Sequence, residues 1–334
     1  MNINMSFIDK IKEKAKYNIK TIILPEAIDK RVLEAASIAL KENYAKIILI
    51  GNEEEIQKLS NENGYDISNA QIIDPYKFEK SKEFAGYLYE LRKEKGMTLE
   101  KAEELVLDEV YLGMLMLKQG MADGLVSGAI HSTSETLKPA LQILKTAPNT
   151  KLVSAFFIMI VPNCEYGEEG VFLFGDCGLN ENPSSQDLAE IAKSSSESFR
   201  QLVGKDSRIA MLSYSTYGSA KSDLTEKVIE ATKIVKEKYP EIKIDGELQL
   251  DSAIVPEIAK VKAPGSTVAG KCNTLIFPDL NAGNIGHKLV QRFAKAEAYG
   301  PLCQGISKPV NDLSRGCSSE DIAGVIAITC VQAQ

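Results

Sequence analysis

Short, continuous apolar runs alternate with amphipathic stretches along most of this chain of 334 residues. Residues 21–25 and 46–51 are two such runs, and between them the apolar positions of residues 31–43 recur at helical spacing. Strands that are apolar on both faces and are separated by helices are typical of a parallel sheet with helices on both sides. The pattern therefore predicts a β-α-β unit at the start of an α/β protein.

The same alternation continues towards the end of the chain. Further apolar strands are predicted at 124–128, 151–161, 171–176 and 209–215. Further helices are predicted at 53–62, 80–95, 98–109, 111–120, 182–199, 223–238 and 322–331. The last of these helices is apolar and needs burial, so we expect it to return to the first sheet. We predict a first α/β domain of residues 1–149 plus 302–334, and a second α/β domain of residues 150–301.

Composition narrows the possible classes of protein. The formal net charge of −7 argues against a general nucleic-acid binder, which needs a basic surface to bind phosphates. Six cysteines without a C-x-x-C pair, together with two histidines, indicate neither a zinc site nor a disulfide framework. Residues 1–20 predict an amphipathic surface helix rather than a signal peptide, and no apolar run reaches the roughly 20 residues of a membrane span. We therefore expect a cytoplasmic protein without nucleic-acid or membrane partners.

The densest cluster of reactive side chains lies in residues 308–321, directly before the last helix. Ser314, Arg315 and Asp321 lie there around a glycine, where a loop becomes a helix. The free N–H groups of a first helical turn and a planar guanidinium can together hold a phosphoryl group. Ser318 and Asp321 also fit a capping box, in which Asp321 is structural. These residues alone leave both interpretations open.

A second polar cluster follows the predicted strand 124–128. Ser132 and Thr133 lie at the expected start of a helix, and Lys138 follows. A phosphate could bind at this helix start, because its N–H groups and the lysine are favourable for an anion. Serine and threonine are also ordinary helix caps, so a purely structural role is equally open.

A third candidate is residues 279–286, a polar, glycine-rich turn that follows an apolar strand. It contains Asn281, Gly283 and Asn284. Open α/β sheets bind ligands beyond the carboxyl ends of their strands, which is where this turn is expected. Arg292 lies on the helix predicted at 288–298, where it is either a ligand contact or a solvated charge.

Several segments, in this order, resemble the phosphate acetyl/butyryltransferase family, and its phosphate acetyltransferases (phosphotransacetylases) in particular. They are L-P-E at 24–26, L-R-K-E-K-G-M at 91–97, S-T with T-L-K-P at 132–139, F-P-D-L-N-A-G-N at 277–284 and P-V-N-D-L-S-R-G at 309–316. The resemblance covers essentially the whole chain. It implies a two-domain isocitrate/isopropylmalate dehydrogenase-like fold, with mostly parallel sheets covered by helices and an active-site cleft between the domains, usually in a homodimer.

The same resemblance implies a reaction and roles for single residues. The reaction is reversible transfer of an acetyl group between acetyl-CoA and inorganic phosphate, giving acetyl phosphate and CoA, without a metal or other cofactor. Asp321 matches the family's proposed base for the CoA thiol, Arg315 suits the phosphate of the acyl phosphate, and Ser314 suits the developing oxyanion. Arg92 matches an arginine used for CoA, and Arg292 matches another family arginine.

One position departs from the family pattern. Lys138 stands where these acetyltransferases commonly have arginine, so the charge is kept and the planar fork is lost. This departure leaves open a phosphate butyryltransferase or another transferase for longer acyl groups. A non-catalytic CoA-binding module of the same fold is a third interpretation, which the intact set of Ser314, Arg315 and Asp321 disfavours. A dehydrogenase of this fold would need metal-binding aspartates and a nicotinamide site that the sequence lacks.

Overall fold

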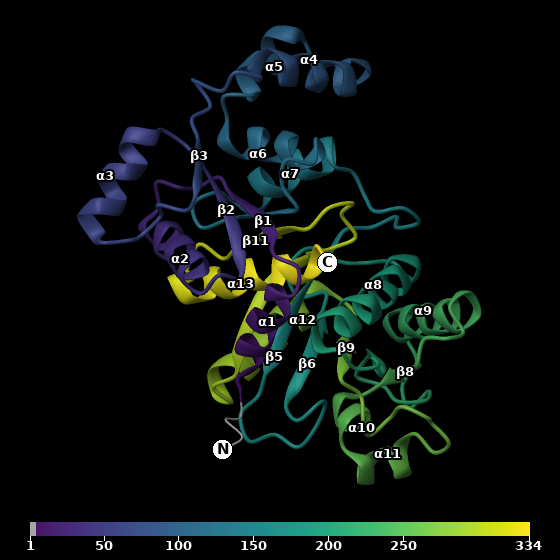
Figure 1. Cartoon of the computed structure of the whole chain (residues 1–334). Helices are drawn as coiled ribbons and strands as arrows, with labels where there is room; N and C mark the ends of the chain where they lie inside the picture. The colour runs from purple at the N-terminus through teal and green to yellow at the C-terminus, as the bar shows by residue number, and fades with distance from the viewer. Residues whose placement is uncertain (1–4) are drawn as a thin grey trace. The chain divides into compact units, whose positions relative to one another are not determined.

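The computed structural model describes residues 5–334, and the chain divides into two compact α/β units (Figure 1). Unit 1 consists of Met1–Pro148 and Ile306–Gln334, and unit 2 consists of Asn149–Gly305. The helix predicted at residues 1–20 is α1 (Phe7–Lys16), with Ser6 as its N-cap. The first four residues of that prediction lie outside the described residues.

Unit 1 is built around a parallel sheet. Its strands are β1 (Lys20–Leu24), β2 (Ala45–Ile50), β3 (Gln71–Ile73), β4 (Gly124–Ser127) and β11 (Val310–Asp312). Their order in the sheet is β11-β4-β1-β2-β3, and every pairing is parallel. Ile22 and Ile23 point to opposite faces of β1 and are both fully buried, as expected for a sheet covered on both sides. The predicted β-α-β start is confirmed.

Helices cover both faces of this sheet. They are α2 (Lys30–Lys41), α3 (Glu53–Asn63), α4 (Ser81–Arg92), the 3-10 turn η1 (Lys93–Lys95), α5 (Leu99–Leu105), α6 (Glu109–Lys118), α7 (Thr133–Ile143) and α13 (Ser319–Gln332). Helices α2 and α13 pack on each other and on the sheet, whereas α6 contacts β1 and β4 together with α7. Because all the strand pairings are parallel, the residues that follow the strands lie at one edge of the sheet.

The C-terminal helix α13 is almost entirely buried. It packs against α1, α2 and β4, so the end of the chain covers the sheet that its start began, after β11 has added an edge strand to that sheet. Burial explains the apolar run that the sequence shows there, since Ile322, Ile326 and Ile328 are all fully buried. Among residues 5–334, no helix is both long and apolar enough to cross a membrane.

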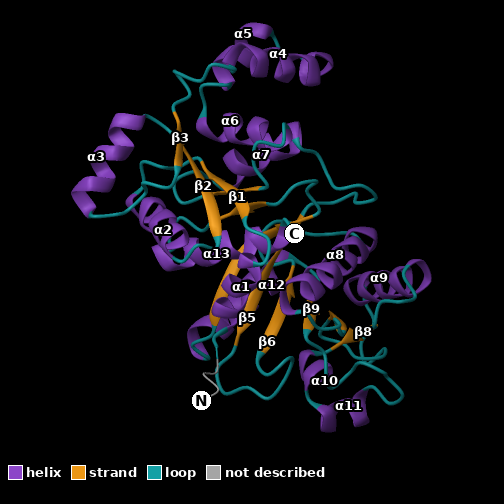
Figure 2. Cartoon of the chain, viewed as in Figure 1, coloured by secondary structure: helices purple, strands orange, loops and turns teal. Residues whose placement is uncertain are grey.

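Unit 2 contains a mixed sheet (Figure 2). Its strands are β5 (Ser154–Ile160), β6 (Val171–Gly175), β7 (Ile209–Leu212), β8 (Ile244–Leu248), β9 (Thr274–Ile276) and β10 (Glu297–Gln304), in the order β10-β5-β6-β9-β7-β8. Strand β5 is antiparallel to both of its neighbours, and the other pairings are parallel. The helices are α8 (Ser185–Val203), α9 (Asp223–Lys238), α10 (Leu250–Ile254), α11 (Pro256–Lys262) and α12 (Leu280–Phe293).

The prediction of a turn at residues 279–286 is wrong. Helix α12 begins at Leu280, because the side chain of Asp279 accepts the N–H of Ala282 at 2.9 Å and caps the helix. Gly283 lies inside the helix because α12 packs closely there: a Cβ would come within 2.4 Å of the Asp176 carbonyl oxygen. The helix predicted at 288–298 is the second half of α12. It ends at Phe293, earlier than predicted, and β10 follows it.

Candidate active site

A buried carboxylate organises the loop after β4. Glu26 follows β1 and is only 2% exposed. It accepts the backbone N–H groups of Ala129, Ile130 and His131 at 2.8, 2.9 and 2.8 Å, and lies 2.9 Å from Nδ1 of His131. Burial alone would raise the pKa of Glu26, but the hydrogen bonds from His131 and the neighbouring N–H groups hold that pKa below its ordinary value. The bond to Glu26 raises the pKa of His131.

Arg31 connects this loop to the segment after β11. Its guanidinium pairs with Asp29 at 2.7 Å and donates to the carbonyl oxygen of Ala129 at 2.9 Å. The same group donates to the carbonyl oxygens of Arg315 and Cys317 at 2.8 and 3.0 Å. One planar side chain therefore fixes the Arg315 backbone relative to the loop that Glu26 holds.

The predicted residues Ser314, Arg315 and Asp321 lie between β11 and the first turn of α13, and all three are exposed. Ser318 and Asp321 form a capping box: Ser318 N–H donates to Asp321 Oδ2 at 2.9 Å, and Asp321 N–H donates to Ser318 Oγ at 3.1 Å. Asp321 therefore has the capping role that the sequence left open. The exposed carboxylate also stays accessible to a ligand, so the contact does not decide against a second role.

The first turn of α7 forms another capping box. Ser132 N–H donates to Glu135 Oε2 at 2.7 Å, and Glu135 N–H donates to Ser132 Oγ at 3.4 Å. These bonds lower the pKa of Glu135, and the charges of His131 and Arg315 lower it further. Arg315 therefore lies near the start of α7. Ser132 has the capping role that the sequence left open, while Thr133 follows it as an exposed residue.

A cavity of about 560 Å³ opens beside α7 in unit 1. Its lining carries four cationic side chains, Arg92, Lys95, Lys101 and Lys138. The lining has two carboxylates, Asp108 and Glu135, so four positive and two negative charges leave a net charge of +2 without His131. The structure therefore brings the predicted Arg92 and Lys138 into one pocket, which we call the basic pocket.

Arg92 is the residue of the basic pocket with the clearest unmet bonding capacity. Its Nε is buried and has no hydrogen-bond partner within residues 5–334. Buried donors are nearly always paired in native proteins, so an unpaired one indicates a missing ligand or water. Lys101, by comparison, already pairs with Glu104 at 2.8 Å.

Four of the predicted site residues belong to unit 2, and all of them lie on α12. Asn281 and Arg292 are exposed. Gly283 packs against the backbone of Asp176, as described above. Asn284 donates to the Cys177 carbonyl oxygen at 3.3 Å and accepts from Lys288 at 2.8 Å. Gly283 and Asn284 therefore have structural roles within unit 2 that the sequence did not predict.

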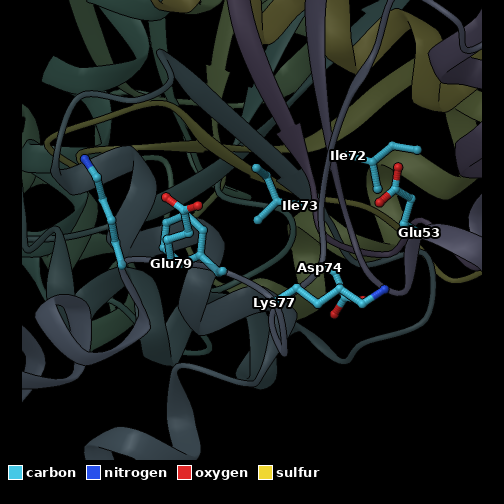
Figure 3. Close-up of a pocket in the computed structure, with 8 residues that line it drawn as sticks. Glu53, Ile72, Ile73, Asp74, Lys77 and Glu79 are labelled. Carbon is cyan, nitrogen blue, oxygen red and sulfur yellow. The ribbon is translucent and has the colours of Figure 1, made fainter.

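Two other cavities contain none of the predicted residues. One, of about 320 Å³, lies at the carboxyl end of β3 and is lined by Glu53, Asp74 and Lys77 among others (Figure 3). Asp74 is satisfied there, because it accepts the N–H of Tyr76 at 3.0 Å and lies 3.7 Å from Lys77 Nζ. The other cavity, of about 330 Å³, is mainly apolar and lies beyond β7 and β9 in unit 2. Residues 5–334 contain no group of three His, Cys, Asp or Glu side chains placed to hold a metal ion.

Two candidate site residues, Glu26 and Arg31, were not predicted from the sequence. Glu26 was noted only as part of the L-P-E segment. It follows a buried strand, however, and parallel sheets bind ligands beyond the carboxyl ends of their strands, so this position could have indicated a site residue. Arg31 looked like an ordinary helical residue. Its carbonyl partners are 98, 284 and 286 residues away, which no local pattern reveals.

Comparisons with known proteins agree over the whole chain. Residues 6–330 match the family model for phosphate acetyl/butaryl transferase. The phosphate acetyltransferase of Acetivibrio thermocellus is 62% identical over 330 residues, which is 99% of each chain. A phosphotransacetylase from Streptococcus pyogenes is 43% identical with a TM-score of 0.93, over 100% of this chain and 99% of that one.

A more distant solved structure bears on the fold alone. A branched-chain phosphotransacylase from Enterococcus faecalis is 20% identical with a TM-score of 0.71, over 94% of this chain and 99% of that one. These solved phosphotransacylases have a two-domain, dehydrogenase-like α/β fold. The predicted fold class is confirmed.

Proposed function

The chain belongs to the phosphate acetyl/butaryl transferase family, and we propose that it catalyses reversible acetyl transfer between acetyl-CoA and inorganic phosphate. The products are acetyl phosphate and CoA. The observation that carries this proposal is the 62% identity to a phosphate acetyltransferase over 99% of both chains. We also propose that the protein is a homodimer, that it is cytoplasmic, and that its ligands are CoA, phosphate and their acetyl derivatives.

The basic pocket supports CoA binding. CoA carries a diphosphate and a further phosphate, so it needs several cations without compensating partners. The pocket offers a net charge of +2 and the buried, unpartnered Nε of Arg92. Arg92 binds a CoA phosphate in this proposal, and Lys138 contributes a point charge where the family commonly has a guanidinium.

The segment after β11 supports binding of the acyl phosphate. In the proposal the Arg315 guanidinium holds the phosphate, and the Ser314 hydroxyl donates to the oxyanion that develops on the acyl carbonyl. Arg31 contributes by fixing the Arg315 backbone, because its guanidinium donates to the Arg315 carbonyl oxygen at 2.8 Å. The N–H groups at the start of α7 add a favourable field for the same anion, because Arg315 lies near that helix start.

Asp321 is the proposed base for the CoA thiol. Its Oδ2 stays bound to the Ser318 N–H, which fixes the carboxylate while it accepts the proton. The thiolate attacks the acyl phosphate directly, so positioning and charge stabilisation supply the catalysis without a covalent enzyme intermediate. Asn281, Asn284 and Arg292 on α12 of unit 2 are proposed to contribute further substrate contacts, and Gly283 to position them through its packing.

A thiol-release assay tests the proposed function. The enzyme is mixed with acetyl-, propionyl- or butyryl-CoA, with and without inorganic phosphate. The proposal predicts phosphate-dependent release that is fastest with acetyl-CoA. Faster release from butyryl-CoA would favour the longer-chain alternative, and CoA binding without release from any of the three would favour the non-catalytic module.

A further inference from the structure

Asp312 is a buried acid with unmet hydrogen-bonding capacity. It is the last residue of β11, pairs in register with Ser127 of β4 and is 2% exposed. Within residues 5–334 neither of its carboxylate oxygens accepts a hydrogen bond of ordinary geometry, and its nearest polar neighbours are the hydroxyls of Thr133 and Thr136. A buried carboxylate without a charged partner or strong hydrogen bonds destabilises a fold, so its presence here indicates a function.

The surroundings of Asp312 lead to the candidate active site. Gly128 has a φ of 108°, and a Cβ there would lie 2.5 Å from Asp312 Oδ1, so glycine makes room for the carboxylate. The hydroxyls of Thr133 and Thr136, from the first turn of α7, lie close to the same carboxylate. Thr136 is buried and Thr133 is exposed. The Thr133 hydroxyl therefore lies between the buried carboxylate and the surface of the site.

The charges around Asp312 disfavour its ionised form. Burial is the main reason that its pKa is raised to about 6, and the negative charge of Glu26 raises it further, while the hydroxyls of Thr133 and Thr136 oppose the shift. The other charged or titratable side chains on the adjoining segments 128–138 and 313–321 are His131, Glu135, Lys138, Arg315, Cys317, Glu320 and Asp321. A phosphate bound nearby would stabilise the neutral form further, because two negative charges in a poorly solvated place repel each other.

The proposed reaction needs a proton on its phosphate side as well as a base for the thiol. When CoA attacks acetyl phosphate, the C–S bond forms and the C–O bond to phosphate breaks. The departing oxygen is a poor leaving group unless it gains a proton to give HPO₄²⁻. In the reverse direction HPO₄²⁻ must lose that proton as it attacks acetyl-CoA. Asp321 serves the sulfur in the proposed mechanism, so the oxygen needs a second group.

We propose, on the basis of the proposed function, that Asp312 holds the proton of the phosphate oxygen and exchanges it through the Thr133 hydroxyl. Towards acetyl-CoA, the thiol proton goes to the Asp321 carboxylate. The neutral Asp312 releases its proton to Thr133 Oγ1, whose own proton goes to the departing phosphate oxygen. Towards acetyl phosphate each transfer runs backwards. Asp312 acts through Thr133 and is therefore a positioning residue rather than a group that touches substrate.

The test is the pH dependence of kcat in the Asp312→Asn variant. Wild-type kcat towards acetyl-CoA should fall as pH rises through the pKa of Asp312 in the complex, because the neutral acid is needed. The variant should lose this alkaline limb and about 100-fold in kcat, while both Michaelis constants change less than about threefold. The control is Asp74→Asn, also a buried acid at the end of a strand in this sheet but one with a backbone partner; it should keep the wild-type profile.

A second variant covers the case in which Asp312→Asn does not fold. Thr133→Val removes the relaying hydroxyl from an exposed position, and the same loss of the alkaline limb is expected. An alkaline limb that persists in the folded Asp312→Asn protein, or in Thr133→Val if the first does not fold, overturns the role of Asp312 while leaving the proposed function intact. Absence of acetyl transfer by the wild-type protein overturns both.

Discussion

The Glu26 carboxylate lies 2.9 Å from Nδ1 of His131 and also accepts the backbone N–H of the same residue at 2.8 Å. Glu26 follows β1 and His131 follows β4, and these strands are neighbours in the sheet. One buried acid thus joins the carboxyl ends of two strands and shapes the loop that leads into α7. The loop at the candidate site is thus held by a charge that is itself buried.

Replacing Glu26 by Gln should lower the free energy of unfolding by about 3 kcal/mol, because it breaks a buried ionic contact. The pKa of Glu26 is lowered from 4.5, so its stabilising effect is present above pH 4.5 and is lost as pH falls through the lowered pKa. The pKa of His131 is raised from 6.5, so its effect is complete below pH 6.5 and is lost as pH rises through the raised pKa. In urea unfolding, the difference in free energy of unfolding between the wild type and Glu26→Gln should be largest between pH 4.5 and pH 6.5. A difference that grows above pH 8 would contradict this account.

Replacing Arg31 by Lys should lower kcat about tenfold, because the charge stays while the fork that binds three carbonyl oxygens is lost. Steady-state rates with acetyl phosphate and CoA measure this effect. The neighbouring Lys30 is exposed, so Lys30→Ala is a suitable control and should behave as the wild type. Equal rates for Arg31→Lys and Lys30→Ala would show that the Arg31 guanidinium does not position the site.

Replacing Arg92 by Ala should raise the Michaelis constant for CoA about tenfold or more, since a charged hydrogen bond to phosphate contributes about 1.5–3 kcal/mol. The matched control is Lys93→Ala. Lys93 is adjacent in sequence, pairs with Glu90 at 2.6 Å and is not among the residues that line the basic pocket. If both variants raise the constant equally, general surface charge rather than the pocket binds CoA.

Replacing Asp321 by Asn should separate catalysis from capping. The Asn side chain retains an oxygen that can accept the Ser318 N–H, so folding and thermal stability should stay near those of the wild type. Turnover should fall by about 100-fold or more, because the amide cannot accept the thiol proton. Near-normal turnover would leave Asp321 with its capping role alone.

Replacing Asp312 by Asn should stabilise the protein at neutral pH. The pKa of Asp312 is raised from 3.8 to about 6, so the neutral acid fits the folded state better than the ion. Its contribution to stability is complete below pH 3.8 and is lost as pH rises through about 6. This difference corresponds to about 3 kcal/mol at most. The free energy of unfolding of the variant relative to the wild type should be higher at pH 8 than at pH 4. An equal difference at both pH values would show that Asp312 is ionised throughout.

The sequence predicted those features that depend on local pattern. The strands β1 and β2 and the helix α13 followed from apolar runs, because buried parallel strands and buried helices have few polar positions. The capping box of Ser318 and Asp321 was also visible, since its spacing is fixed by the geometry of one helical turn.

Features that depend on tertiary packing were missed. Asn281, Gly283 and Asn284 have turn-like propensities, yet they are helical because Asp279 caps α12 and the helix packs tightly on the backbone of Asp176. The burial of Asp312 beside the α7 hydroxyls could not be predicted either, since it depends on how β11, Gly128 and α7 meet.

The most direct test of the account follows the product itself by phosphorus NMR. Purified protein is incubated with acetyl-CoA and inorganic phosphate, and acetyl phosphate and free thiol are measured in the same sample. Acetyl phosphate and free thiol are expected to appear together in a one-to-one ratio, and propionyl- and butyryl-CoA are expected to react more slowly. Thiol release without acetyl phosphate, or no release at all, would contradict the proposed function.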